Sequence, residues 1–291
     1  MTSLFPLPTP QSRVSLQRTR GGGRLSVKLS AGESRIDRLF QEGSARIRVP
    51  RVPRGSPLEA VLINTAGGLT GGDVMDWAFE AGEGAAMTLA TQACEKTYKA
   101  QGESEAQVSV RLKLGPASAL AWLPQETILF DRARLKRSIE VDMAAGSRLL
   151  MVEPVVFGRL AMQESVVEGQ FRDRWRIRHG GLLLHAEDMR LGPAIAETLG
   201  RGAVTGGGLA VATVLMIGPD AEAGLAPARA LIGASGGASY LTARHSGAAS
   251  DETGKLLARI VASDSYELRK ILVPLIRLLN PSGGVPKVWS I

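Results

Sequence analysis

Apolar and polar residues alternate through much of the chain from about residue 58 to residue 216, and this period of two constrains the fold more than any other feature. Clear examples are residues 74–80, 107–114 and 138–143. Short connections containing small residues and glycine follow them, with sequences AGEG, GPAS and AAGS, and each is short enough for a hairpin. We therefore predict a mainly β fold, in which successive hairpins build stacked, multi-layer antiparallel or mixed sheets.

Helical signals are confined to the C-terminal third of the chain. Residues 219–232 are rich in alanine, and residues 254–279 carry apolar residues at helical spacing, so we predict a helix in each segment. Pro274 is expected to kink or end the second helix. The last residues, PSGGVPKVWSI, are predicted to be extended, with Trp289 docked on the body. No interdomain linker is recognisable, so we predict one domain, 1–291, with 1–20 as a poorly ordered tail.

Composition narrows the possible functions. One cysteine and three histidines exclude an internal disulfide and a cysteine-rich cluster, and they argue against a tightly bound transition metal or cofactor. No run of about 18 apolar residues suggests a membrane span. The N-terminus lacks the basic segment of a signal peptide, so a cytoplasmic location is expected. The net charge of +7 favours an acidic partner, without the dense patches of a nucleic-acid-binding protein.

A glycine-rich run, NTAGGLTGGD, spans residues 64–73. Asp73 follows the last glycines where a phosphate-binding loop requires Lys and Ser or Thr, and the glycine spacing does not match a dinucleotide-binding fingerprint. Alternation resumes directly afterwards, so the helix that would hold a phosphate is missing. The run is therefore predicted to be a shaped turn between strands, where glycine allows close approach of the backbone.

Two further motifs suggest chemistry, although each has a simpler interpretation. Residues 233–237, GASGG, match the G-x-S-x-G pattern of hydrolases around Ser235, but a predicted helix precedes the motif and no acid separates Ser235 from His245. We interpret this match as a coincidence. Cys94 has no evident histidine partner, which favours a small buried residue over a nucleophile or a metal ligand.

Charged residues supply the remaining candidates. Segment 171–178, FRDRWRIR, places arginines on one face of a strand, either as a solvated face or as a docking surface for an acidic partner: Arg172, Arg174, Arg176 and Arg178. Carboxylates scattered along the strands and turns are usually solvated or ion-paired. If they converge, they would form a path of oxygen ligands for a divalent cation.

Five blocks, taken in order, resemble the urease accessory protein D family, also called accessory protein H. They are NTAGGLTGGD (64–73), TQACEKTYK (91–99), WLPQETILFD (122–131), FGRLAMQE (157–164) and PKVW (286–289). Thr65 and Ala66 stand where most members of the family have two prolines. The resemblance covers most of the chain, and it is specific because the number, order and spacing of the blocks all agree.

The resemblance implies a β-rich, non-enzymatic chaperone that binds apo-urease and, through accessory protein F, the GTPase accessory protein G. Nickel would then be a transient cargo, and we expect four carboxylates to line or flank its route: Asp73, Glu126, Asp131 and Glu164. Two alternatives stay open at this point. One is a serine hydrolase using Ser235, and the other is a β module that binds an anionic polymer.

Overall fold

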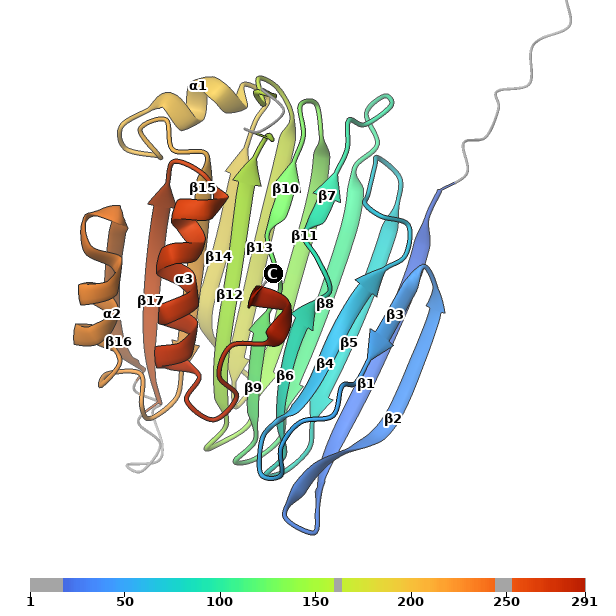
Figure 1. Cartoon of the computed structure of the whole chain (residues 1–291), viewed down its shortest axis with the longest axis vertical. Helices are drawn as coiled ribbons and strands as arrows, with labels where there is room; N and C mark the ends of the chain where they lie inside the picture. Colours follow the sequence, from blue (N-terminus) through green and yellow to red (C-terminus); the bar gives the residue numbers. More distant parts are fainter. Residues whose placement is uncertain (1–17, 160–163, 244–252, 291) are drawn as a thin grey trace, which may run out of the picture.

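The computed structural model describes residues 18–159, 164–243 and 253–290, which form two stacked sheets and a layer of helices (Figure 1). Sheet A has the strand order β14 (Leu182–Leu191), β13 (Gln170–His179), β11 (Arg134–Met143), β8 (Ala106–Leu114), β5 (Val74–Ala81), β1 (Arg20–Ser30) and β2 (Glu33–Gly43). Sheet B has the order β16 (Gly236–Ala243), β17 (Thr253–Ala262), β15 (Ala210–Ile217), β12 (Arg148–Phe157), β9 (Ala119–Leu123), β6 (Ala86–Thr91), β4 (Leu58–Asn64) and β3 (Ala45–Arg48). The prediction of a mainly β fold is confirmed.

The AGEG, GPAS and AAGS connections are not hairpins, which corrects the sequence prediction. The AGEG connection takes the chain from β5 in sheet A to β6 in sheet B, and GPAS and AAGS likewise join β8 to β9 and β11 to β12. The neighbouring strands β5, β8 and β11 therefore run parallel, whereas strands joined by a true hairpin, such as β13 and β14, pair antiparallel. The connections also stack on one another: Gly84 N–H donates to the Pro116 carbonyl at 2.9 Å, and Ala117 N–H donates to the Ala145 carbonyl at 3.1 Å.

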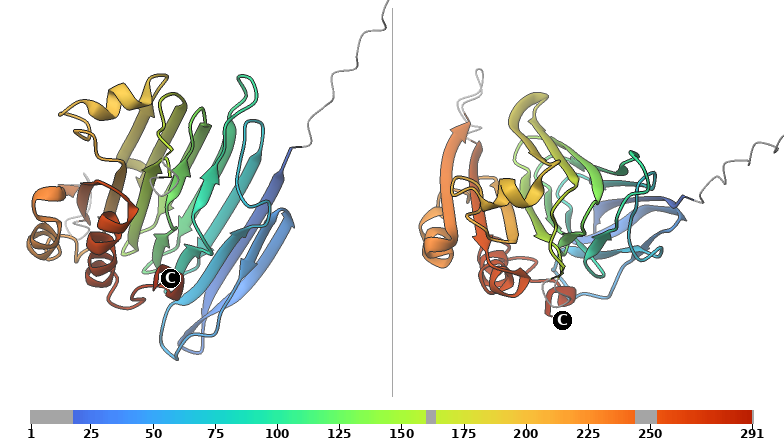
Figure 2. Two further views of the ribbon diagram at one scale, coloured as in Figure 1. Left: turned by 45° about the horizontal axis from the view of Figure 1, so that its top comes forward. Right: turned by 90° about the horizontal axis from the view of Figure 1, so that it is seen from above.

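Two hydrophobic cores follow from the three layers. The first lies between the sheets and includes Trp77 from sheet A and Trp122 from sheet B. The second lies between sheet B and the helices α2 (Leu225–Ile232) and α3 (Ser265–Leu279). Sheet B is therefore covered on both faces, which explains why β12 is almost continuously apolar. Seen from above, α2 and α3 gather at the end of the molecule that holds β16 and β17, away from β1 and β2 (Figure 2).

The C-terminal third contains less helix than the sequence predicts. Residues 253–262 form β17, whereas only the second half of the predicted helix is helical, as α3. Because β17 packs against both the intersheet core and the helix layer, it carries apolar residues on both faces, and these imitate helical spacing. Similarly, only Leu225–Ile232 of the predicted segment 219–232 is helical.

Helix α3 begins at a side-chain cap and ends beyond its proline. The Asp264 carboxylate accepts a hydrogen bond from the Glu267 N–H at 2.9 Å, which satisfies one free donor of the first turn. The helix continues past Pro274 to Leu279, so of the two predicted effects of the proline, ending the helix is wrong and a kink stays a prediction. The C-terminal segment places η3 (Lys287–Ser290) on the body, and the buried Trp289 indole donates to the Leu123 carbonyl at 3.0 Å, as predicted. In the described ranges, no helix is both long and apolar enough to cross a membrane.

Candidate functional site

The interior between the sheets holds a buried ion cluster centred on Arg137. Asp173 lies on β13, directly opposite Arg137 on β11, and accepts two hydrogen bonds from the guanidinium at 2.9 and 2.6 Å. The guanidinium donates a third hydrogen bond to Thr127 at 3.2 Å. The same guanidinium is ion-paired with Glu153 of sheet B, which also accepts a hydrogen bond from the Trp122 indole at 2.6 Å. The cluster therefore ties the two sheets together through three charged groups that are almost fully buried.

The sequence carries a signal for this cluster, although none of its three charged residues is among the predicted site residues. Arg137 and Asp173 lie in the apolar phase of their strands, between Leu135 and Ile139 and between Phe171 and Trp175. Glu153 is the single charged residue in the interior of an otherwise apolar β12. A charge in the buried phase of a strand requires a buried partner of opposite sign, so the three residues could have been grouped.

A cavity of about 60 Å³ adjoins the cluster, with room for a few water molecules. Its polar lining includes Glu95, Gln125, Thr127, Arg137 and Glu153. Burial raises the pKa of the Glu95 carboxyl to about 7, with the charge of Asp73 adding to the shift and hydrogen bonding from Asn64 opposing it. Burial likewise raises the pKa of Glu153, against the attraction of Arg137. The cavity therefore brings two proton-exchanging carboxyls to one place.

The glycine run folds against the cavity wall as a shaped turn, as predicted. Leu69 pairs with the short strand β7 (Glu95–Thr97), donating its N–H to the Lys96 carbonyl at 2.7 Å. Gly68 has φ +150°, and a Cβ there would lie 2.7 Å from the Lys96 carbonyl oxygen, so only glycine fits. Asp73 is buried and accepts hydrogen bonds from the Thr19 and Thr70 N–H groups, each at 2.8 Å. Both of its oxygens therefore hold the turn.

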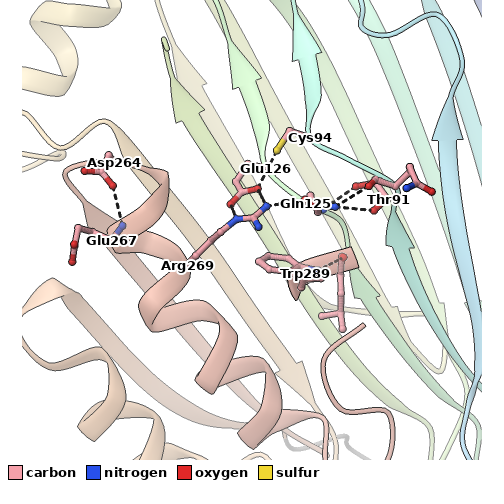
Figure 3. Close-up of polar contacts among 10 residues, drawn as sticks. Thr91, Cys94, Gln125, Glu126, Asp264, Glu267, Arg269 and Trp289 are labelled. Carbon is pink, nitrogen blue, oxygen red and sulfur yellow. Dashed lines mark hydrogen bonds and ion pairs between the residues drawn. The ribbon is translucent and has the colours of Figure 1, made fainter. Parts of the chain in front are cut away.

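Glu126 faces helix α3 and is the centre of a second polar cluster (Figure 3). It precedes the short strand β10 (Thr127–Leu129), and its carboxylate accepts hydrogen bonds from Arg269 at 2.6 and 2.7 Å. Burial opposes ionisation of Glu126, but the hydrogen bonds from Arg269, the backbone and Cys94, together with the charge of Arg269, outweigh burial and lower the carboxyl pKa. Arg269 also donates to the Gln125 side chain at 2.7 Å and lies over the Trp289 ring. The cluster fixes α3 and the C-terminal segment to sheet B.

The other two predicted carboxylates also have local partners. Asp131 accepts hydrogen bonds from the N–H groups of Val167 and Glu168, at 2.8 and 3.0 Å. Glu164 is ion-paired with Arg159 at 2.6 Å. Within the described part of the chain, no group of three or more His, Cys, Asp or Glu side chains could hold a metal ion. The nickel route through Asp73, Glu126, Asp131 and Glu164 thus stays a prediction.

The arginines of β13 lie on the outer face of sheet A, with Phe171, Trp175 and Ile177 on the buried face, as the alternation predicts. Arg172 and Arg174 are exposed. Arg176 and Arg178 are half-buried, and Arg176 donates to the carbonyls of Trp175 and Glu187 at 2.6 and 2.9 Å. The four arginines therefore do not form one equivalent row.

The structure agrees with the interpretation of the GASGG motif around Ser235 as a coincidence and of Cys94 as a structural residue. Ser235 ends η2 (Gly233–Ser235) after helix α2 and before strand β16, the reverse of a nucleophile elbow. His245 lies outside the described residues. Burial and the neighbouring Glu126 carboxylate raise the pKa of the Cys94 thiol to about 11, so it stays protonated and is a poor nucleophile at neutral pH. Cys94 is partly rather than fully buried and contacts Glu126 at 3.2 Å.

The fold and the site define a layered β protein with an ion-paired interior and a helix layer on one sheet. The profile of the family described as "UreD urease accessory protein" matches residues 19–290. Urease accessory protein UreD of Mesorhizobium japonicum is 51% identical over 275 residues, covering 94% of this chain and 95% of the relative. UreD 1 of Brucella ovis is 51% identical over 280 residues, 96% and 97% of the two chains. UreD of Agrobacterium fabrum is 49% identical over 281 residues, 97% and 94%. The chain therefore belongs to the UreD family of urease accessory proteins, which confirms the resemblance.

Proposed function

We propose that this protein is a non-enzymatic scaffold of urease maturation, which binds apo-urease and recruits accessory proteins F and G for nickel insertion. The observation that carries this proposal is the family match over nearly the whole chain, residues 19–290. GTP hydrolysis is assigned to accessory protein G, in keeping with the absence of a phosphate-binding loop motif from this sequence.

Nickel is a cargo in this proposal, held briefly by oxygen ligands. Carboxylates bind Ni²⁺ less tightly than clusters of Cys and His, so a protein that passes the ion onward benefits from them. To the four carboxylates predicted from sequence we add Glu95 and Glu153, which line the intersheet cavity. A raised pKa makes each carboxyl exchange its proton near neutral pH, so proton release would accompany entry of the cation.

The substitution Glu95→Gln separates a role in nickel transfer from a role in folding. Because the folded protein holds a proton on Glu95 up to about pH 7, wild-type stability falls as pH rises from about 4.5 to 7. Glutamine removes this penalty, so the variant should be more stable than wild type at pH 8, by roughly 2–3 kcal/mol. We expect urease activation at limiting nickel to fall several-fold in the same variant.

The matched control is Glu103→Gln, which removes an exposed carboxylate and should change neither property. Full activation by Glu95→Gln at limiting nickel would remove Glu95 from the proposed route. Loss of activation together with lower stability at pH 8 would instead indicate a structural role.

The four carboxylates predicted from sequence need a parallel test that allows for their hydrogen bonds. Each is replaced by alanine, and urease activation at limiting nickel is compared with the thermal stability of the same variant. Glu164 gives the clearest result, because its partner Arg159 is 42% exposed and little stability depends on the pair. Full activation by all four variants would contradict the route.

A further inference from the structure

Four basic side chains gather at one corner of the outer face of sheet A, on β11, β13 and β14. The strand register places Lys136 directly opposite Arg172, and Arg172 directly opposite Arg190. Arg174 follows two residues along β13 on the same face. All four are exposed. We call these residues, Lys136, Arg172, Arg174 and Arg190, the basic corner.

The rest of this face balances its charges across neighbouring strands. Glu140 lies opposite both Arg111 and Arg176. Asp142 in the same way lies opposite both Lys113 and Arg178. Each of these acids on β11 therefore sits between two cations, as expected for a face that only has to be stable in water.

The basic corner lacks this balance. In the two cross-strand rows that contain Arg172 and Arg174, the acid is Asp188, directly opposite Arg174. Asp188 accepts hydrogen bonds from Arg190 at 2.9 and 3.1 Å and forms a salt bridge with Arg176 at 3.6 Å. Among the residues that the structure describes, Lys136, Arg172 and Arg174 form no salt bridge. Like charges placed directly opposite each other in a sheet are destabilising. The repulsion among the cations of the corner therefore lowers stability, and an anionic partner bound to them would turn this repulsion into attraction.

We propose that the basic corner binds an acidic segment of a protein partner, a contact that rests on the scaffold function proposed above. Arginine binds carboxylate with two parallel hydrogen bonds, so Arg172 and Arg174 suit Asp or Glu side chains. The two arginines are separated by roughly 6.8 Å along the strand, the repeat at which an extended chain presents alternate residues. An acidic segment with carboxylates at every second position therefore matches the corner. Such an exposed contact acts mainly on the rate of association.

The surroundings favour a protein over a nucleic acid. Proteins that bind single strands combine basic grooves with aromatic side chains on which bases stack. The exposed aromatic residues of the described chain are Phe40, Tyr98 and Tyr266, and none lies on the three strands of the corner. The corner also spans only two rows of the sheet, which is short for a track along a nucleic-acid backbone.

The test compares two double variants with the same change in net charge. Arg172→Glu with Arg174→Glu reverses the corner, whereas Arg38→Glu with Arg54→Glu reverses two exposed arginines that lie outside it. Binding of each variant and of wild type to apo-urease, to accessory protein F and to accessory protein G is measured separately by biolayer interferometry, at low and at high salt. We expect the corner variant to bind one of these partners about tenfold more weakly at low salt, mainly through slower association, and the difference to shrink at high salt. The control variant should bind like wild type.

Four results would overturn the proposal. The corner variant could bind every partner as wild type does, or both double variants could lose the same affinity, which would indicate net charge alone. The corner variant could also lose binding only to a single-stranded oligonucleotide probe, which would assign the corner to nucleic acid. If wild type binds none of the three proteins, the scaffold function itself fails, and the corner's assignment fails with it. Thermal denaturation of each variant shows that it is folded.

Discussion

Replacing Arg137 with methionine tests whether the buried ion cluster is held together by its one cation. The side chain is 6% exposed, and its partners Glu153 and Asp173 are 2% and 4% exposed, so all three charged groups lie in the protein interior. Methionine fills much of the same volume but leaves two buried carboxylates facing each other. Breaking a buried pair in this way costs roughly 3–5 kcal/mol. This is a large part of the roughly 5–15 kcal/mol that stabilises a typical protein.

The pH dependence of this loss has a definite sign. Burial already raises the pKa of the Glu153 carboxyl, and loss of the guanidinium raises it further, so the folded variant binds more protons than the unfolded chain. Its stability therefore falls as pH rises above the ordinary carboxyl pKa, so the deficit relative to wild type is larger at pH 8 than at pH 5. Urea denaturation at both pH values, followed by tryptophan fluorescence, measures this difference. Trp122 reports directly because it donates to Glu153.

A triple variant, Arg137→Met with Glu153→Gln and Asp173→Asn, provides the control. It removes every charge of the cluster, so no buried ion is left unpaired, and it should recover at least half of the stability that the single variant loses. The reasoning would be refuted if the single and triple variants were equally unstable. It would also be refuted if the deficit of the single variant did not depend on pH.

Three further predictions concern other parts of the molecule. Arg269→Met leaves the buried Glu126 without its cation and should lower stability at neutral pH by roughly 2–4 kcal/mol, with a smaller deficit under acid conditions, in thermal denaturation at both pH values. Gly68→Ala places a Cβ 2.7 Å from the Lys96 carbonyl oxygen and should cost roughly 1–3 kcal/mol by the same assay; an unchanged melting temperature would show that the turn adapts. Arg172→Gln removes the repulsion between Arg172 and the opposite Lys136 and Arg190, and should raise the free energy of unfolding by roughly 0.2–1 kcal/mol at low salt. Because salt screens this repulsion, a gain that stays the same at high salt would contradict the account.

The alternation of residues predicted the strands well but could not predict their connections. Alternation reports that one face of a strand is buried, and a strand in a hairpin and a strand that crosses between sheets both satisfy it. The AGEG, GPAS and AAGS connections look alike because they stack on one another in the fold. This contact joins segments about 30 residues apart, so a local pattern that is typical of hairpins does not reveal it. The period of two is also weak at β17, because the apolar Leu257 and Val261 share one face of the strand with Lys255 and Arg259.

The candidate site was predicted in part, and the missing part depends on long-range contacts. The glycine run is a shaped turn, as predicted, and the hydrogen bonds that Asp73 accepts from Thr19 and Thr70 show how the turn is held. Glu126 was singled out, but its partner Arg269 is 143 residues away, and no local pattern joins them. Glu95 was visible only as one charge among several in its segment. Its raised pKa comes from burial, which a sequence pattern does not reveal.

The central claim is that this chain is required for nickel insertion into urease. The most direct test is to express the urease operon of the source organism with and without this one gene, to purify urease from both, and to measure nickel per enzyme. We predict that urease made without this chain lacks most of its nickel and that restoring the gene restores loading. Normal nickel loading without the chain would contradict the account.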